Sequence, residues 1–353
     1  MLTTTDHFVP HVSTVPANAG QLVGIHVREK AARGGRVGRV VLFVHGISVP
    51  SVPAFDLDHK TYSWMAYLAR AGFRVYAMDL TGYGGSARPM MDDPSNVNPQ
   101  QQGIITPRPL RGARAANYPY QLNTIRDDWN EIDTVVEWLR SSHRVRRVNL
   151  IGWSAGGPRV GGYVVLHPRK VERAVLFAPA PTIAGLSIPE TTEAGFPVNL
   201  QTREDLEKKR WDPDVRCPGQ LEPGMRDVVW NAIMRWDRVG AAWGPEGGVM
   251  RVRSATRFGW TPELAAKVRA PTLVMAGEFD RLEERRRVFE QIGSKDKVFL
   301  TVSCASHFVL WEKQHAALHA ASKQWLTRGR LGKVRRGEMH VDPDGEFRSG
   351  AGN

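Results

Sequence analysis

The chain has 353 residues, of which 42% are hydrophobic and 24% charged, and this composition suits a globular protein with a large buried core. The formal net charge of +12 is unusual, but no nucleic-acid motif and no aromatic-interleaved basic patch accompanies it. No apolar run approaches the roughly 18 residues that cross a bilayer, and the first 20 residues lack a signal-peptide core. We therefore expect a cytoplasmic protein without membrane insertion and without a nucleic-acid partner.

The predicted elements alternate between strands and helices. Strands are expected as a pair within residues 7–30 and at 39–47, 73–78, 145–151, 173–178, 271–276 and 297–302, with helices at 62–71, 129–139, 157 onward and 311–327. Such βα alternation predicts an α/β fold with a mainly parallel, doubly wound sheet. Residues 87–121 are rich in Pro, Gly, Gln and Asn, and a gating loop and a disordered excursion are equally compatible with them.

The alternation stops between Pro181 and about Pro262. We expect residues 1–181 and 263–328 to form the core domain, 182–262 a helical cap, and 329–353 a polar tail with a turn at 342–345. Apolar side chains of the cap should roof a pocket, which favours a bulky apolar substrate group. Most cap arginines should face water, although one could pair with a substrate carboxylate; they are Arg226, Arg235, Arg238, Arg251, Arg253 and Arg257.

The pattern Gly152-Trp153-Ser154-Ala155-Gly156 lies between a predicted strand and a predicted helix. In this context a G-x-S-x-G sequence indicates a nucleophile elbow, a turn so tight that only small residues fit around the serine. We therefore predict that Ser154 is a catalytic nucleophile.

A base and an orienting acid should follow, because a serine hydroxyl reacts only after it loses its proton. Asp280 follows one late strand and His307 follows the next, so the order Ser154, Asp280, His307 is that of one triad-bearing fold. Glu278 is the rival for the acid, and the shorter Asp280 is preferred. Cys304 is interpreted as a small hydrophobe, and we expect it and Cys217 to be reduced, although a disulfide between them stays open.

The early strand ends in His45-Gly46, next to a loop that could supply backbone N–H donors to an oxyanion. We assign these donors to Ala155, which follows the nucleophile, and to Ile47, with Ser48 as the next choice for the second donor. His45 is expected to bond nearby backbone groups.

These segments resemble the α/β-hydrolase family: His45-Gly46 and the ranges 79–86, 152–156, 277–280 and 306–308, within residues 20–328. The resemblance implies an eight-stranded sheet with a cap insertion, as in serine esterases and lipases, with no cofactor and no metal. Serine at 154 argues against the dehalogenase and epoxide-hydrolase branches. Asp79 should only fix its glycine-rich turn.

The sequence thus predicts a serine hydrolase that cleaves a carboxylic ester of a bulky apolar or aromatic small molecule through an acyl-enzyme. Trp153, Ser48 and Phe308 are expected to contact the substrate. Lactone, thioester or C–C hydrolysis on the same triad, and a non-catalytic ligand-binding protein, remain as alternatives. Attraction of an anionic substrate by the positive net charge, and a homodimer, are left open.

Overall fold

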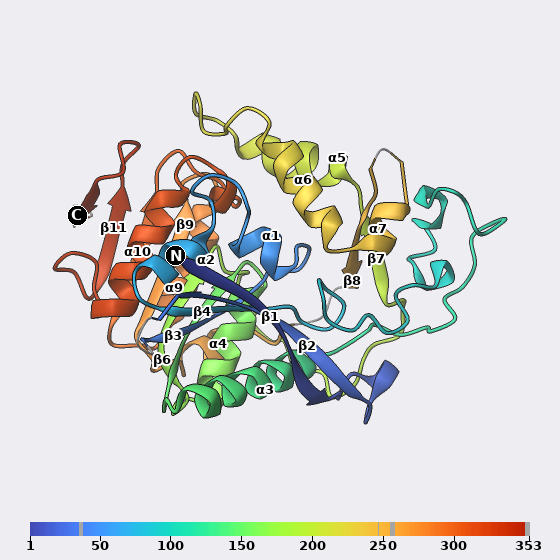
Figure 1. Cartoon of the computed structure of the whole chain (residues 1–353), viewed down its shortest axis with the longest axis horizontal. Coiled ribbons are helices and arrows are strands. Elements are labelled where there is room, and N and C mark those ends of the chain that lie inside the picture. The colour runs from blue at the N-terminus through green and yellow to red at the C-terminus, as the bar shows by residue number, and fades with distance from the viewer. Residues whose placement is uncertain (35–37, 246, 255–257, 350–353) are drawn as a thin grey trace.

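The computed structural model describes residues 1–34, 38–245, 247–254 and 258–349, and a ten-stranded sheet runs through it (Figure 1). In spatial order the strands are β1 (Leu2–Val12), β2 (Leu22–Ala32), β4 (Arg74–Met78), β3 (Val40–Val44), β5 (Val148–Trp153), β6 (Val171–Phe177), β9 (Thr272–Gly277), β10 (Lys297–Val302), β11 (Gly337–Val341) and β12 (Phe347–Ser349). The seven strands from β4 to β11 are parallel, and β1, β2 and β12 pair antiparallel with their neighbours. The predicted α/β class with a mainly parallel sheet is confirmed.

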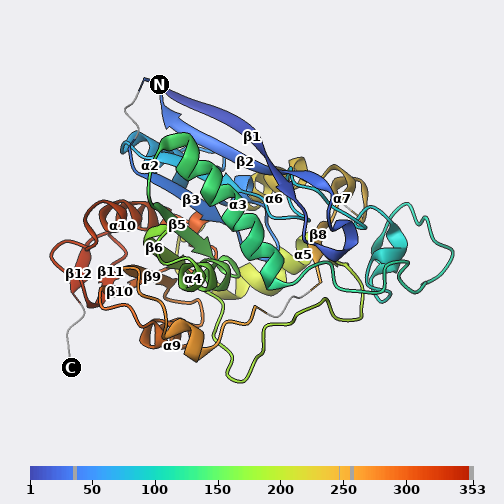
Figure 2. The ribbon, with the colours of Figure 1, turned by 90° about the horizontal axis from the view of Figure 1, so that it is seen from below.

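Helices cover both faces of the sheet (Figure 2). One face carries α1 (Ser51–Phe55), α2 (Trp64–Arg70) and α10 (His315–Arg328), and the other carries α3 (Ile125–His143), α4 (Gly156–Leu166), α8 (Pro262–Ala265) and α9 (Leu282–Gln291). Alternate residues of β3 enter opposite cores, Phe43 on the first face and Leu42 on the second. Because both faces are buried, the central strands are continuously apolar, which is why the sequence revealed them.

We had expected the C-terminal segment to be a polar tail, but it contributes two strands to the sheet. The sheet therefore has ten strands instead of the expected eight. β11 pairs with β10 and β12 pairs with β11, and the predicted turn joins them, with the Gly345 N–H donating to the Asp342 carbonyl at 2.9 Å. Met339 and Val341 alternate along β11 and are buried. Together with Leu331, which is fully buried in the same core, these apolar residues dock an otherwise polar segment.

The inserted segment 182–262 is not purely helical. Besides α5 (Arg203–Leu206), α6 (Met225–Arg235) and α7 (Arg238–Ala242) it contains an antiparallel pair, β7 (Val198–Gln201) and β8 (Met250–Arg253). The long loop 87–121 packs against this pair (Figure 1), since the Gln101 side chain bonds both backbone groups of Leu200 and Val97 is fully buried beside Val198. The loop is therefore not a disordered excursion.

Candidate active site

Ser154 lies in the sharp turn between β5 and α4. Its φ is 56°, a left-handed value that costs a non-glycine residue of order 1–3 kcal/mol. A Cβ at Gly152 would come within 2.2 Å of the Gly156 carbonyl oxygen, and one at Gly156 within 2.3 Å of the Val44 carbonyl oxygen. The prediction that only small residues fit here is confirmed, and the surrounding packing holds the serine in its strained turn.

His307 and Asp280 meet beyond the ends of β10 and β9. The ring Nδ1 of His307 lies 3.0 Å from Oδ1 of Asp280, which leaves Nε2 as the available base. Burial raises the pKa of Asp280, but the charge and hydrogen bond of His307, together with Arg285, lower it to below its usual value, so the carboxylate stays ionised. Ser154 and His307 line one cavity of about 700 Å³, although in the described part of the chain the Ser154 hydroxyl makes no hydrogen bond to the ring. Such bonds often tighten only when substrate binds.

The two rival acids have different partners. Glu278 accepts a hydrogen bond from the Cys304 backbone N–H at 2.9 Å, whereas Asp280 contacts His307. Asp280 also accepts two bonds from the Arg285 guanidinium, at 3.1 and 3.2 Å. Arg285 belongs to a run of three arginines, 285–287, and is buried because the first turn of α9 folds back over Asp280.

The loop after β3 lies against the nucleophile, since a Cβ at Gly46 would sit 3.2 Å from the Cβ of Ser154. Arg159 of α4, which the sequence analysis did not single out, is buried and donates at 3.0 Å to the carbonyls of both His45 and Gly46. In a trans peptide the N–H points opposite to the carbonyl, so this contact turns the Ile47 N–H away from Arg159. Within the described residues, the N–H groups of Ile47 and Ala155 have no protein acceptor.

His45 and Asp79 have the structural environments that we expected. His45 Nδ1 donates to the Gly46 carbonyl at 2.7 Å, its Nε2 accepts from the Leu80 N–H, and burial lowers its pKa to about 3, so the ring is neutral. Asp79 accepts from the Gly85 N–H at 3.1 Å within the glycine-rich turn, and also from His26.

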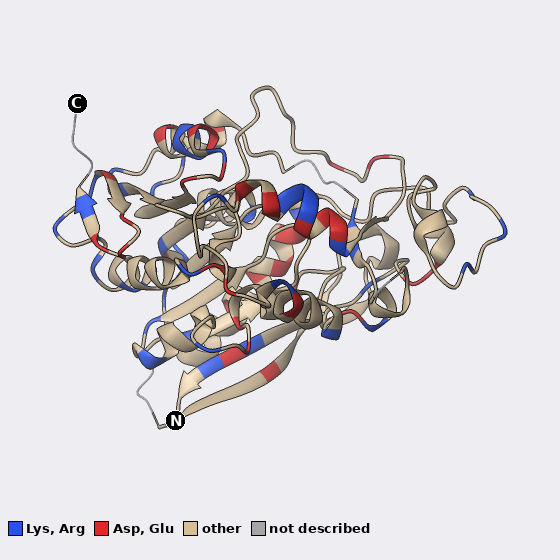
Figure 3. Ribbon diagram, turned by 90° about the horizontal axis from the view of Figure 1, so that it is seen from above, with Lys and Arg blue, Asp and Glu red and all other residues tan. Residues whose placement is uncertain are grey.

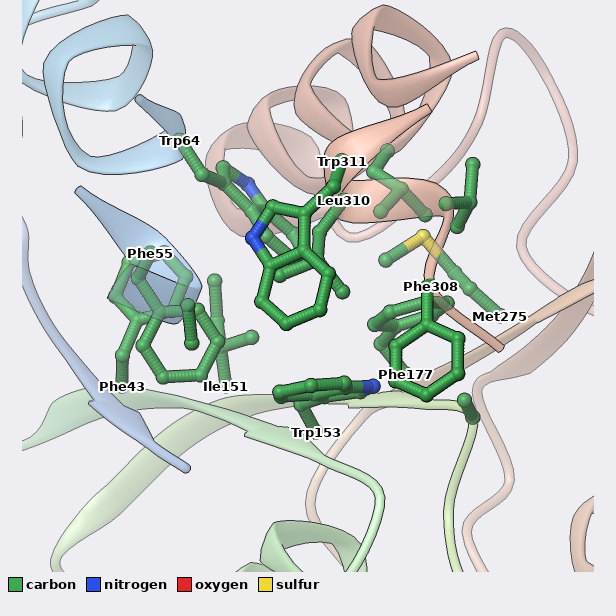
Figure 4. Packing of buried hydrophobic residues seen from close by; sticks show 14 of the residues in the cluster. Phe43, Phe55, Trp64, Ile151, Trp153, Phe177, Met275, Phe308, Leu310 and Trp311 are labelled. Atoms are coloured by element: carbon green, nitrogen blue, oxygen red, sulfur yellow. The ribbon is translucent and has the colours of Figure 1, made fainter. Parts of the chain in front are cut away.

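Three residues were predicted to contact substrate, and the structure separates them. Phe308 is on the cavity wall. Trp153 is in the core instead, 3% exposed, with its indole packed among Phe308 and Trp311 (Figure 4) and its N–H directed at the His307 carbonyl. Its side chain points to the face of the sheet opposite α4, so it supports the His307 loop from beneath. Ser48 is buried and bonds Arg210, which reaches it from the inserted segment.

The wall that segment 182–262 gives to the cavity is charged, where an apolar roof was expected. It consists of Lys209, Arg210, Pro213, Asp214 and Arg216. The tryptophans at 211, 230 and 260 are at most 2% exposed, because they turn inward to pack on the core. Of the six arginines considered above, Arg257 lies outside the described residues, and none of the other five is on this wall.

Cys217 and Cys304 form a disulfide, with their Cα atoms 5.6 Å apart, which corrects the expectation of reduced thiols. The bond joins the inserted segment to the turn three residues before His307. We had expected reduced thiols only because a cytoplasmic location was expected, and nothing in the sequence indicated that the two cysteines lie close together in the fold.

A sequence model of the alpha/beta hydrolase family matches residues 41–321. Among solved structures, a serine hydrolase involved in carbazole degradation is 19% identical (TM-score 0.54, 92% of this chain and 99% of that one). A 2-hydroxy-6-oxo-6-phenylhexa-2,4-dienoate hydrolase from Rhodococcus sp. strain RHA1 is 14% identical (TM-score 0.54, 92% and 100%). Naproxen esterase from Bacillus subtilis is also 14% identical (TM-score 0.53, 92% of each chain). No curated protein is significantly similar in sequence. Among the helices that the structure describes, none has the length and apolarity needed to cross a membrane.

Proposed function

Because the chain belongs to the α/β-hydrolase family, we propose that this hydrolase cleaves carboxylic esters of small molecules with Ser154 as its nucleophile. The observation that carries the proposal is the Asp280–His307 pair, which borders the same cavity as the strained serine. Each member lies beyond the end of a parallel strand, where open α/β sheets place their sites.

In the proposed reaction His307 Nε2 takes the Ser154 proton while Oγ attacks the ester carbonyl. The resulting oxyanion accepts hydrogen bonds from the Ala155 and Ile47 N–H groups, and such donors contribute about 3 kcal/mol each to lowering the barrier. The tetrahedral intermediate collapses, the bond to the alcohol oxygen breaks, and His307 returns the proton to that oxygen. Water, deprotonated by His307, then hydrolyses the acyl-enzyme and releases the acid. Asp280 holds the ring and stabilises its cation.

The cavity supports an ester that carries an aromatic or apolar group. Phe279 supplies aromatic surface, and Leu282, Pro181 and Pro213 supply aliphatic surface around Ser154. Phe308 also borders the cavity, but it is only 1% exposed. Segment 182–262 contributes one wall, which is the basis for proposing that it acts as a cap. The remaining lining residues are mostly charged, so the bound molecule must also suit a polar environment.

A panel of 4-nitrophenyl esters, aryl lactones and acyl thioesters tests the proposal. We expect ester cleavage, and loss of kcat by at least about 10³-fold in Ser154→Ala with the fold retained by circular dichroism. Ser303→Ala is the matched control, because Ser303 follows β10 without lining the cavity, and its activity should be unchanged. Full activity of Ser154→Ala, or failure of a fluorophosphonate probe to label the wild-type serine, would overturn the mechanism.

A further inference from the structure

The wall of the catalytic cavity contains an unbalanced positive charge. Five cationic side chains line the cavity: Lys209, Arg210, Arg216, Arg281 and Arg285. Four of them have a carboxylate within 4.0 Å, respectively Asp205 for Lys209, Asp214 for Arg216, Glu284 for Arg281 and Asp280 for Arg285. Within the part of the chain that the structure describes, Arg210 has none. Acidic and basic residues are interspersed along most of the ribbon (Figure 3). The lack of a carboxylate partner for Arg210 among the described residues is therefore a local feature of the cavity wall.

The hydrogen bonds of Arg210 leave much of its guanidinium unsatisfied. Nη1 donates to the Ser48 hydroxyl at 3.1 Å and to the Gln201 side-chain oxygen at 3.2 Å, both neutral acceptors. In the described part of the chain, Nε and Nη2 have no protein acceptor. The group also lies over the Phe308 ring, 5.5 Å from its centroid, so its plane is fixed between the cavity wall and the oxyanion loop. A guanidinium that is anchored at one nitrogen presents the others in a fixed fork.

The electrostatic setting of Arg210 is unfavourable without a ligand. Burial lowers the pKa of Arg210 and the positive charge of Arg281 lowers it further, whereas the charge of Asp205, which forms its ion pair with Lys209, opposes this shift only in part. Arginine still remains charged, so the group pays for partial desolvation without a counter-ion. An anion placed in the cavity would be stabilised by Arg210 and Arg281 together.

From this geometry we propose that Arg210 binds a free carboxylate of the substrate, so that the preferred substrate is an ester that also carries a carboxylate. Planar carboxylate oxygens match the guanidinium fork. The carboxylate would hold the molecule while its ester carbonyl lies near Ser154, so Arg210 is a specificity-determining residue and takes no part in bond breaking. The inference names the substrate class of the site proposed above and rests on that function, but the binding step can be measured separately.

The activity test compares anionic and neutral esters of matched size. For the acyl side the pair is 4-nitrophenyl hydrogen glutarate and 4-nitrophenyl valerate, and for the alcohol side it is 4-acetoxybenzoate and 4-methylphenyl acetate. We expect the wild type to prefer the anionic member of at least one pair. In Arg210→Gln, kcat/KM for that ester should fall about 10- to 100-fold, with the neutral ester changed by less than about threefold. Arg210→Lys keeps the charge without the fork and should recover only part of the preference.

Lys208→Gln is the matched control, because Lys208 lies two residues before Arg210, is exposed, pairs with Asp212 and does not line the cavity. It removes the same charge and should leave the preference intact. Equal loss on the anionic and neutral esters in Arg210→Gln, or cleavage of both pairs by the wild type with no preference for the anionic member of either, would overturn the inference. Melting temperatures of both Arg210 variants show whether a loss reflects misfolding.

Binding without turnover separates the two proposals. Glutarate and benzoate are titrated into Ser154→Ala by calorimetry, alone and combined with Arg210→Gln. Arg210-dependent binding together with a wild type that cleaves no ester would sustain the carboxylate-binding role of Arg210 and reject the esterase. Ester cleavage by the wild type would sustain the esterase, and the role of Arg210 would then be rejected if the acids bind equally with and without Arg210 or if neither acid binds.

Discussion

The indole N–H of Trp211 donates to the Glu312 carboxylate at 2.9 Å, and both side chains are fully buried. The same carboxylate accepts from the Gln220 side chain, and from both the N–H and the hydroxyl of Ser306, the residue before His307. Glu312 therefore joins the inserted segment to the loop that carries the proposed base. Trp211 directly follows Arg210, so the link also positions the cation on the cavity wall.

Replacing Glu312 with Gln should weaken this junction. Four donors converge on the two oxygens, and an amide would set its own NH₂ against one or two of them. Burial raises the pKa of Glu312, although these hydrogen bonds oppose the rise. We expect the free energy of unfolding to fall by about 1–3 kcal/mol, measured by urea denaturation. Glu283→Gln, on an exposed position of α9, should change it by less than about 0.5 kcal/mol.

The disulfide makes a second, covalent connection between the same two parts. Cys217 and Cys304 are 87 residues apart, so removing the bond releases a long loop in the unfolded chain. Cys217→Ser combined with Cys304→Ser should lower the free energy of unfolding by about 2–4 kcal/mol. Dithiothreitol should lower the melting temperature of the wild type and leave that of the double variant unchanged. If the reductant has the same effect on both proteins, the disulfide does not stabilise the fold.

The nucleophile elbow and the eight strands that were expected depend on local patterns, and the structure contains them. The G-x-S-x-G pattern is readable locally although its two glycines have different neighbours: Gly152 faces the Gly156 carbonyl four residues later, whereas Gly156 faces the Val44 carbonyl of β3. Buried parallel strands are continuously apolar. Arg159 and Arg285 could not be assigned in this way. Their partners are set by how α4 and α9 fold back on the sheet, and in the sequence both look like ordinary helix cations.

The inserted segment was predicted least well, for a related reason. Its tryptophans suggested an apolar roof, yet Trp211 turns inward and Arg210 lines the cavity. Adjacent residues of a helical turn face different directions, and composition does not say which of them faces the site. The strand β11 was missed because only Met339 and Val341 mark its buried side.

His26, a buried residue of strand β2, should make the free energy of unfolding depend on pH. Burial lowers the pKa of His26, but Asp79, 2.7 Å from Nδ1, and Asp6, 3.1 Å from Nε2, raise it to above its usual value. A group whose pKa is raised by folding stabilises the protein below its unfolded pKa of about 6.5, and this stabilisation disappears as the pH rises through the folded value. His26→Asn should therefore destabilise the protein more at pH 6 than at pH 9, by about 1 kcal/mol in urea titrations. An equal loss at both pH values would show that folding does not raise the pKa of His26.

Arg285 should influence catalysis by holding Asp280 in position. Its guanidinium donates to both oxygens of Asp280, at 3.1 and 3.2 Å, and His307 shares one of these oxygens. In Arg285→Gln the carboxylate loses these two charge-assisted bonds and is no longer held against the His307 ring, so kcat with the 4-nitrophenyl esters should fall about 10-fold. Arg287→Gln removes the same charge from an exposed position of α9 and should leave kcat unchanged. An unchanged kcat in Arg285→Gln would show that Asp280 orients His307 without help from Arg285.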